Sequence, residues 1–205
     1  MKIGLISDIH GNWPGLLKAL TLFNDQGVET VLCAGDLIEG EPYGDKVVST
    51  IREKAIPCVL GNHDELAFEN QKWLRKFYRP EDRLSDETVA FVSAFPPTLT
   101  FTFGETRLLL THGTPWSNSV YVFPDSASSL FDRVVAEANA DIVVLGHTHT
   151  PMCRQIKDTW IINPGSVAGN RDADIQSCAV LEIAPFTLRI FDLNSGKVIR
   201  TGGTA

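Results

Sequence analysis

Five short apolar runs, each ending in a group of polar residues, constrain the fold of this chain more than any other feature. They cover Lys2–Ile6, Thr30–Ala34, Pro57–Leu60, Arg107–Leu110 and Ile142–Leu145. Runs of this length, apolar at successive positions and rich in β-branched residues, are typical of strands that are buried on both faces. The chain is therefore expected to build a sheet structure that is covered on both sides.

Helical patterns separate the first three of these runs. Between Asn12 and Gly27, Pro14 stands where a first helical turn tolerates proline, and apolar residues recur at helical spacing. A second helix is predicted over Asp45–Lys54. Strands that alternate with helices favour β-α-β units, whose right-handed connections bring the carboxyl ends of parallel strands to one edge of a sheet. The polar groups that follow the runs should therefore meet at that edge, where such sheets bind ligands.

The rest of the chain adds a helical insertion and a set of antiparallel strands. Residues 65–94 are rich in helix-forming, charged and aromatic residues, and they are interpreted as one or two helices that form a lid or an edge layer. A strand is predicted over Thr98–Phe103 and a helix over Ser126–Asn139. From Met152 onward, short strands joined by turns indicate antiparallel pairing. The 205 residues are expected to form one domain that carries the insertion.

Composition and charge exclude several classes of protein. Hydrophobic residues make up 43% and charged residues 21%, as in a soluble globular protein, and no apolar run approaches the ~18 residues that cross a bilayer. Ser7 and Asp8 interrupt the first apolar stretch before it reaches the length of a signal peptide, and the four cysteines form no C-x-x-C pair. We therefore expect a cytoplasmic protein with reduced, mostly buried thiols. The formal charge of −7 argues against a nucleic-acid polymer as partner, but a small phosphorylated substrate remains compatible, because bound metal ions reverse the sign locally.

All five histidines of the chain follow a predicted strand. They are His10, His63, His112, His147 and His149. Histidines kept for packing would be scattered among helices and surface loops. Taken singly, the motifs D-x-H and G-D are common turn chemistry, and an isolated H-x-H pair is usually incidental. The ordered set D-x-H, G-D, G-N-H-D, T-H and G-H-x-H is far more specific, and it indicates a site that binds metal ions and moves protons.

The ordered set resembles that of the calcineurin-like metallophosphoesterases, from residue 2 to about residue 166. The sequence Asn-Pro-Gly-Ser at 163–166 is similar to that of the small bacterial and archaeal phosphodiesterase branch of the family. The resemblance implies an α/β fold of two mixed β-sheets packed face to face, with helices on the outer faces in a four-layer α/β/β/α arrangement. This fold agrees with the pattern of strands and helices described above.

The resemblance also implies a site for two divalent metal ions. Seven side chains would hold them, namely Asp8, His10 and His149 on one ion, Asn62, His112 and His147 on the other, and Asp36 on both. Ligand sets that mix imidazole and carboxylate suit Mn, Fe, Ni or Zn better than Ca or Mg, so transition-metal ions such as manganese are expected. Two such ions leave the site net positive, and an anionic phosphate is therefore attracted to an acidic protein.

The implied activity is hydrolysis of phosphodiesters, with monoesters left open, by in-line attack of a metal-bridging hydroxide. Two divalent ions neutralise the phosphate oxygens and lower the pKa of bound water to about 7. His63 is assigned as general acid for the leaving alkoxide. Asp64 is expected to fix the orientation and tautomer of His63, although capping of the following helix is an equal alternative. Asn12 is a candidate contact for a phosphate oxygen, against the alternative that it caps a helix.

Other functions compete with this one. A non-catalytic scaffold for protein assembly would use the same fold, but such a protein would be expected to lose metal ligands, and none is missing here. A mononuclear or structural metal site would need fewer ligands. A protein phosphatase or a dinucleoside-polyphosphate hydrolase commonly carries arginine before the G-N-H motif, where this chain has Leu60, which favours small diesters such as cyclic nucleotides. A homo-oligomer stays open, and substrate choice is expected to depend on residues 65–94 and 113–125.

Overall fold

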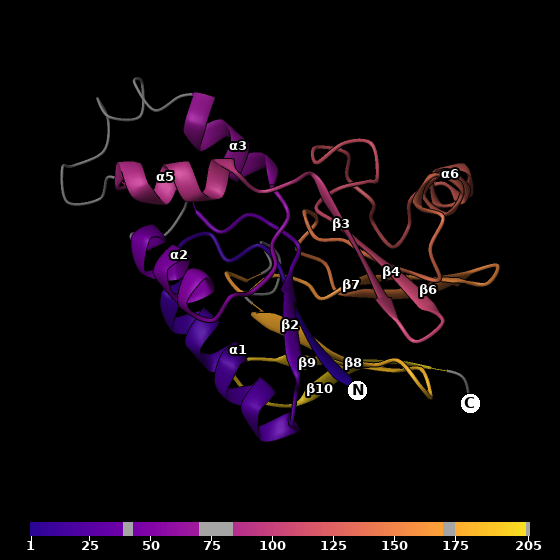
Figure 1. Ribbon diagram of the computed structural model, residues 1–205. Helices are drawn as coiled ribbons and strands as arrows, with labels where there is room; N and C mark the ends of the chain where they lie inside the picture. The colour runs from indigo at the N-terminus through magenta and orange to yellow at the C-terminus, as the bar shows by residue number, and fades with distance from the viewer. Residues whose placement is uncertain (39–42, 70–83, 170–174, 204–205) are drawn as a thin grey trace.

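Ten strands form two five-stranded sheets in the computed structural model, which describes residues 1–38, 43–69, 84–169 and 175–203 (Figure 1). The strands of the first sheet are β1 (Lys2–Ile6), β2 (Thr30–Cys33), β8 (Ser177–Glu182), β9 (Thr187–Asp192) and β10 (Val198–Gly203). Those of the second are β3 (Thr98–Phe103), β4 (Thr106–Thr111), β5 (Ile142–Val144), β6 (Met152–Ile156) and β7 (Thr159–Asn163).

Both sheets are mixed. The first has the order β10-β9-β8-β1-β2, in which β1 and β2 are parallel and the other neighbours antiparallel. The second has the order β3-β4-β5-β7-β6, in which β5 lies parallel to both β4 and β7 and the edge strands β3 and β6 are antiparallel. The predicted antiparallel pairing after Met152 is therefore present, divided between the two sheets.

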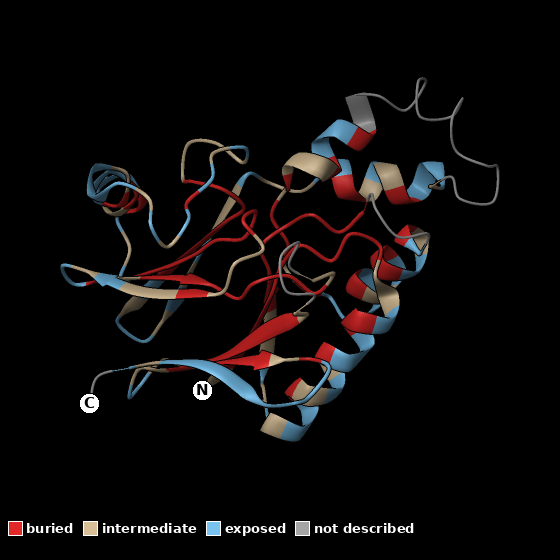
Figure 2. Ribbon diagram, turned by 180° about the vertical axis from the view of Figure 1, so that it is seen from behind, coloured by how far each residue is buried: buried red, intermediate tan, exposed pale blue. Residues whose placement is uncertain are grey.

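Helices cover the outer face of each sheet. The helices α1 (Trp13–Gln26) and α2 (Gly44–Glu53) pack on the first sheet, and α6 (Ser128–Ala138) packs on the second (Figure 1). Buried residues lie on the sheets and on the inward sides of these helices, as Figure 2 shows. The predicted four-layer α/β/β/α arrangement is confirmed.

Alternation along the strands explains how the layers are filled. Leu108 and Leu110 of β4 face the space between the sheets, together with Ile3 and Leu5 of β1. Leu109, which lies between the two leucines, belongs instead to the cluster under α6. Successive side chains of a strand point to opposite faces, so a run that is apolar at every position can serve two cores at once. This is the physical reason for the unbroken apolar runs in the sequence.

The helix α1 begins and ends where its sequence requires. Asn12 accepts a hydrogen bond from the backbone N–H of Gly15 and so caps the helix, and Pro14 lies in the first turn. Gly27 adopts a left-handed conformation with φ of 68° and closes the last turn. Between them the buried stripe runs from Leu16 to Phe23 at helical spacing. The predicted helix over this segment is confirmed.

Two further helices occupy the segment predicted as an insertion. They are α3 (Asn62–Glu69) and α5 (Asp86–Ser93), and α5 packs against both α2 and α3. Residues 70–83, in the middle of the predicted lid at 65–94, lie outside the described residues. The role of the segment as a lid therefore stays a prediction. None of the helices in the described ranges is long and apolar enough to span a bilayer.

The predicted strand at Pro57–Leu60 is wrong in its extent. This segment pairs with β2 only at a single parallel bridge between Cys33 and Cys58. Cys33 N–H donates to the carbonyl of Pro57, and Val59 N–H donates to the carbonyl of Cys33. The pairing stays short because proline has no N–H to donate and because β2 ends at Cys33, just before the left-handed Gly35.

Candidate metal centre

The predicted ligands lie on loops that follow strands of both sheets. Asp8 and His10 follow β1, Asp36 follows β2, Asn62 opens α3, His112 follows β4, and His147 and His149 follow β5. The structure brings these seven side chains into two adjoining groups of metal-ligating atoms. The convergence that the parallel strands predict is therefore observed.

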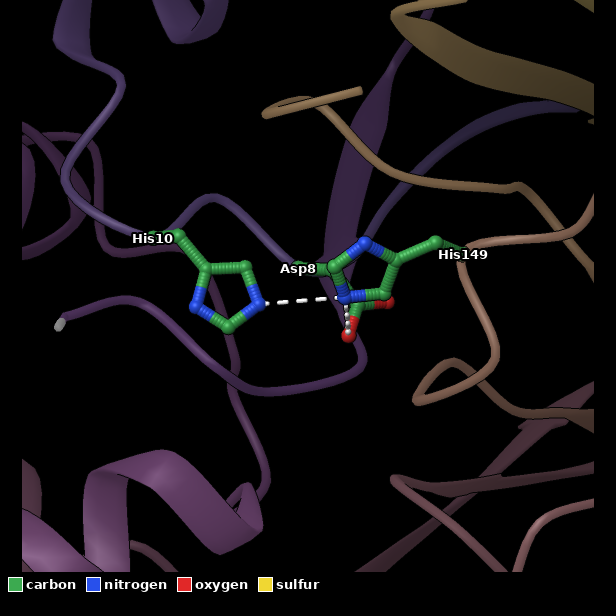
Figure 3. Close-up of side chains that lie close together, drawn as sticks. All are labelled: Asp8, His10 and His149. Atoms are coloured by element: carbon green, nitrogen blue, oxygen red, sulfur yellow. Dashed lines mark hydrogen bonds and ion pairs between the residues drawn. The ribbon is translucent and has the colours of Figure 1, made fainter. Parts of the chain in front are cut away.

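The first group consists of Asp8, His10 and His149. Their ligand atoms all lie within 4.8 Å of one another. Nε2 of His149 lies 3.3 Å from Oδ1 of Asp8 and 3.1 Å from Nε2 of His10, and the three side chains point toward a common centre (Figure 3). One carboxylate and two imidazoles at this spacing match the donor set of a transition-metal site.

The second group consists of Asp36, His112 and His147, whose ligand atoms also lie within 4.8 Å of one another. Oδ2 of Asp36 lies 3.1 Å from Nε2 of His112. It also lies 3.8 Å from Nε2 of His10, a member of the first group. Oδ1 of Asn62 is 3.0 Å from Nε2 of His112. Asp36 therefore stands between the two groups, where the resemblance assigns a bridging ligand, and Asn62 lies beside the second.

Backbone contacts hold the imidazole rings in orientations suited to metal binding. Nδ1 of His112 lies 2.6 Å from the carbonyl of Ala34, and Nδ1 of His149 lies 3.1 Å from the carbonyl of Gly169. A carbonyl accepts the proton of Nδ1 and so leaves Nε2 of each ring as the free lone pair that a cation needs.

Two buried atoms at the centre fit a metal ion better than they fit the protein alone. Among the described residues, Oδ2 of Asp36 and Nε2 of His147 are buried without a hydrogen-bond partner of good geometry. Leaving such groups unsatisfied costs about 1–3 kcal/mol each. Nε2 of His10 and of His149 also face each other, an arrangement that one proton or one cation must bridge. Divalent ions would satisfy all four atoms, so the residues present fit the metals that the resemblance implies.

The charges of the centre also favour cations. Burial alone would raise the pKa of Asp36, but His112 and His10 hold it well below its usual range. Burial lowers the pKa of His112, yet the carboxylates of Asp36 and Asp8 outweigh it and raise that pKa to about 9. Burial and the neighbouring His112 lower the pKa of His147 to about 4. Asp36 is thus ionised and His147 neutral at neutral pH, as metal ligation requires, and an ion that binds His112 would displace the proton that the raised pKa places on this ring.

Most of the candidate ligands have an unusual backbone conformation. Of the eight non-glycine residues with positive φ in the described part of the chain, five are candidate ligands, namely Asp8, His10, Asp36, His147 and His149. The left-handed conformation costs a residue that carries a Cβ roughly 1–2 kcal/mol. Such strain persists only where the surrounding structure enforces it, and it gathers at functional sites. The ligands are therefore held in place before any ion binds.

Two glycines allow the ligand loops to approach one another. A Cβ at Gly61 would lie 2.0 Å from Oδ1 of Asp36, and a Cβ at Gly146 would lie 1.9 Å from Oγ of Ser7 and 2.8 Å from Oδ2 of Asp8. Neither distance can be met without displacing a ligand. The glycines of the G-N-H-D and G-H-x-H motifs are thus explained by the close approach of two loops.

His63 lies at the rim of the first group. Its ring is edge-on to that of His10, with centroids 4.9 Å apart, and its backbone N–H donates to Oδ1 of Asp36. It is partly exposed, whereas most of the candidate ligands are buried. A partly exposed imidazole beside the two groups of ligand atoms is suitably placed to meet the leaving group of a substrate. The role of His63 as an acid stays a prediction.

Asp64 interacts with the backbone of the bridging loop. Its fully buried carboxylate accepts hydrogen bonds from the N–H groups of Asp36, Leu37 and Ile38, and from that of Gly61. The last bond is the helix-capping alternative, made across the first turn of α3. The others fix the loop that carries the bridging carboxylate. Burial and the charge of Asp36 raise the pKa of Asp64 to about 7.

Asn12 makes the contacts expected of a helix cap. Its Oδ1 accepts from Gly15 N–H, and its Nδ2 donates to the carbonyl of Val167. Both ends of the amide are therefore engaged within the protein, which favours the capping interpretation over substrate contact.

Two buried side chains support the ligand loops and were not assigned a role from the sequence. Asn163 donates to the carbonyl of Gly146 and to Oγ1 of Thr148, and so holds the loop of His147 and His149. Ser166 donates to the backbone carbonyl of Asp8. Both belong to the Asn-Pro-Gly-Ser sequence, and these hydrogen bonds give that sequence a physical role in the centre. In the sequence, the only indication of this supporting role is that small polar residues directly follow a buried strand.

Comparisons with known proteins agree with the fold and with a metal-dependent activity. Residues 1–185 match the model of the calcineurin-like phosphoesterase superfamily domain. The chain therefore belongs to the calcineurin-like phosphoesterase superfamily, and the predicted enzyme class, a metal-dependent phosphoesterase, is confirmed.

Individual relatives come from archaea, bacteria and a eukaryote. The chain is 28% identical to the phosphodiesterase MJ0936 of Methanocaldococcus jannaschii, over 82% of this chain and 86% of the relative. It is 25% identical to the phosphodiesterase YfcE of Escherichia coli. The solved structure of YfcE superposes on this chain with a TM-score of 0.67 over 100% of both chains. Vps29 of Entamoeba histolytica, solved in complex with Zn²⁺, shares the fold at 20% identity, with a TM-score of 0.63 over 100% of this chain and 98% of the other.

Proposed function

We propose that this chain hydrolyses small phosphodiesters at a centre formed by two metal ions, with His63 as general acid. The observation that carries the proposal is the position of Asp36, whose Oδ2 lies between His112 of one group of ligand atoms and His10 of the other. A single carboxylate shared by two groups is the arrangement that holds two ions side by side. The names of the phosphodiesterase relatives support the substrate class.

The chemistry divides between the ions and the protein. When bound, two divalent ions supply charge neutralisation of the phosphate oxygens and activation of water. The protein orients the ligands through the backbone carbonyls of Ala34 and Gly169, and Asp64 fixes the loop of Asp36. We propose that the ring of His63 gives a proton to the departing alkoxide oxygen from the rim of the first group, while Asp64 assists by fixing the backbone around it.

Substrate size and partners follow from charge and composition. An acidic chain with a formal charge of −7 has no electrostatic advantage on a nucleic-acid polymer, so a small ester such as a cyclic nucleotide or another diester is the proposed substrate. The four cysteines are free, and three of them are buried, which supports the expected cytoplasmic location. The metals are proposed to be Mn, Fe, Ni or Zn, because imidazoles dominate the ligand set. We propose that α3 and α5 belong to a lid over the centre within one domain.

A protein-assembly scaffold is the second candidate function. The likeness of fold to Vps29 favours it, and the zinc complex of that protein shows that its chain also holds a metal. The complete ligand set of this chain, with His63 beside it, favours catalysis more strongly, because assembly alone needs no acid beside the metals.

The function is tested by metal content and turnover together. The purified protein is to be loaded with Mn²⁺, Fe²⁺, Ni²⁺ or Zn²⁺, analysed for bound metal, and assayed on bis-p-nitrophenyl phosphate and p-nitrophenyl phosphate. We expect close to two metals per chain and faster turnover of the diester. Protein that holds two ions and hydrolyses neither ester would favour the scaffold, and one ion per chain would contradict the shared carboxylate.

A further inference from the structure

We propose that Tyr121 and Phe123 form a stacking platform that selects phosphate esters carrying a planar aromatic ring. The proposal rests on the function proposed above and names the substrate class of the same centre. Tyr121 stacks on His147, with ring centroids 3.8 Å apart and planes 19° apart. The phosphate and the platform would therefore share His147 as a neighbour, so a ring attached to a bound phosphate lies within reach of Tyr121.

The platform is extended by a second ring. Phe123 lies parallel to Tyr121, with centroids 5.6 Å apart and planes 10° apart. The side chain of Tyr121 is 50% exposed and that of Phe123 is 40% exposed. Large aromatic side chains that lie together at a surface leave apolar area in water, and contiguous exposed apolar patches mark binding sites. The area offered is flat, which suits a ring better than an alkyl chain.

The segment that carries the platform is held firmly in place. Val122, between the two rings, is buried in the cluster under α6, so alternation sends its neighbours outward. The backbone N–H of Phe123 donates to Oγ of Ser126, and the Arg154 guanidinium donates to the carbonyl of Pro124. A preformed surface loses little entropy on binding, which is the condition for stacking to contribute to affinity.

The segment also connects to the other side of the centre. Nδ2 of Asn118 donates to Oε2 of Glu65, which lies on α3 one residue after Asp64. Residues 118–123 are therefore joined to the start of α3 close to the second group of ligand atoms. Because His147 covers one face of Tyr121 and Phe123 overlaps part of its ring, a planar group would stack on the exposed parts of Tyr121 and Phe123 while its phosphate faces the ligands.

Stacking on an aromatic side chain changes the affinity for a base by about fivefold to a hundredfold. The test compares ligands that differ only by their ring, namely AMP against ribose 5-phosphate for a nucleobase, and phenyl phosphate against methyl phosphate for an aryl group. Titration calorimetry on the Mn²⁺-loaded protein measures each affinity, and analysis of released phosphate after each titration shows whether a ligand was hydrolysed. We expect the ring-bearing member of one pair to bind at least about fivefold more tightly, and the pair that discriminates identifies the source of the ring.

Variants separate the platform from a merely structural role. Phe123→Leu removes a ring that stacks on Tyr121 and not on the candidate ligand His147. The metal content should therefore stay near two ions per chain, while the preference for ligands that carry a ring falls. Tyr121→Phe should retain the preference, and Tyr121→Leu should lose it. Leu17→Ala, an exposed apolar change on α1, serves as control and should alter neither quantity.

Equal affinities within both pairs in the wild-type protein would overturn the platform, even if bis-p-nitrophenyl phosphate is hydrolysed. An undiminished ring preference in both Phe123→Leu and Tyr121→Leu would also overturn it. If the loaded protein hydrolyses no ester, the proposed function fails, and the calorimetric comparison still decides the platform, because binding needs no turnover.

Discussion

At the scale of single residues, the centre depends on side chains whose partners come from distant parts of the chain. Asp36 contacts His112 and His10, and its loop is fixed by Asp64. Asp36 is thus a carboxylate through which one substitution would reach both groups of ligands. Single substitutions can therefore test the roles of these residues.

Asp36→Asn is expected to weaken binding at both metal sites and to abolish activity. The amide keeps the size of the side chain but removes the negative charge that both ions would share, so the loss should exceed the ~10–100-fold typical of partners outside the ligand shell. Metal analysis after dialysis and turnover of bis-p-nitrophenyl phosphate measure the effect. Asp158→Asn, an exposed carboxylate in the β6–β7 turn, is the matched control. Two tightly held ions with full activity in Asp36→Asn would refute the assignment.

His63→Ala is expected to keep both metals and to lose turnover, because its ring lies beside the ligands rather than among them. A positioned acid contributes roughly 10²–10⁴-fold, and it matters most when the leaving group is a poor one. Rates on a p-nitrophenyl ester and on an alkyl ester of the same phosphate measure this. An equal loss on both esters would remove His63 from the role of acid.

At the scale of elements, the loops after the strands must approach each other more closely than side chains allow. The left-handed conformation of five candidate ligands and the glycines of the motifs both result from this crowding. The segment Pro57–Leu60 and the end of β2 run side by side only briefly, and each then turns into its ligand loop. The motif glycines are thus as necessary to the centre as the ligands.

Gly61→Ala is expected to displace Asp36 and to lower metal affinity at both sites. The added Cβ would lie 2.0 Å from Oδ1 and 2.3 Å from the backbone nitrogen of Asp36, so the loop must move. Gly104→Ala is the control, because its Cβ would meet nothing within 4 Å and only the strain of a φ of +63° applies, about 1–2 kcal/mol. Metal titration and thermal unfolding of both variants measure the difference. A Gly61→Ala protein that binds metal as the wild type does would contradict this account of the loop.

At the scale of the whole molecule, each group of ligands connects the two sheets. Asp8 and Asp36 follow strands of the first sheet, whereas His112, His147 and His149 follow strands of the second. An ion bound to either group would therefore join the sheets across their common edge. Metal binding and the stability of the sandwich should be coupled for this reason.

Removal of the metals is expected to lower the melting temperature. An ion present at 100 times its Kd stabilises the folded state by about 2.7 kcal/mol, which corresponds to about 5–10 °C per site in a domain of this size. Unfolding followed by circular dichroism, with and without a chelator, measures the shift, and added Mn²⁺ should restore the original value. Identical melting curves for the loaded and the metal-free protein would contradict a site that spans both sheets.

The sequence alone determined the elements that local physical chemistry controls. The strand Thr98–Phe103 and the cap and closing glycine of α1 agree with prediction, and the helix predicted over Ser126–Asn139 differs from α6 by only a few terminal residues. Apolar periodicity and turn chemistry act within a few residues, so they can be recognised in a chain without its fold. The order of the histidine and aspartate motifs likewise identified the family before any geometry.

Only the tertiary structure decided the features that depend on contacts across the chain. Asp8 accepts from the N–H of His147, 139 residues away, and Asn163 and Ser166 bind loops that no periodicity connects to them. The left-handed ligands, the bonds of Asp64 to the bridging loop and the stacking of Tyr121 on His147 arise in the same way. A hydrogen bond or a ring contact requires two groups at a defined distance, and the packing of the two sheets, rather than local sequence, sets that distance.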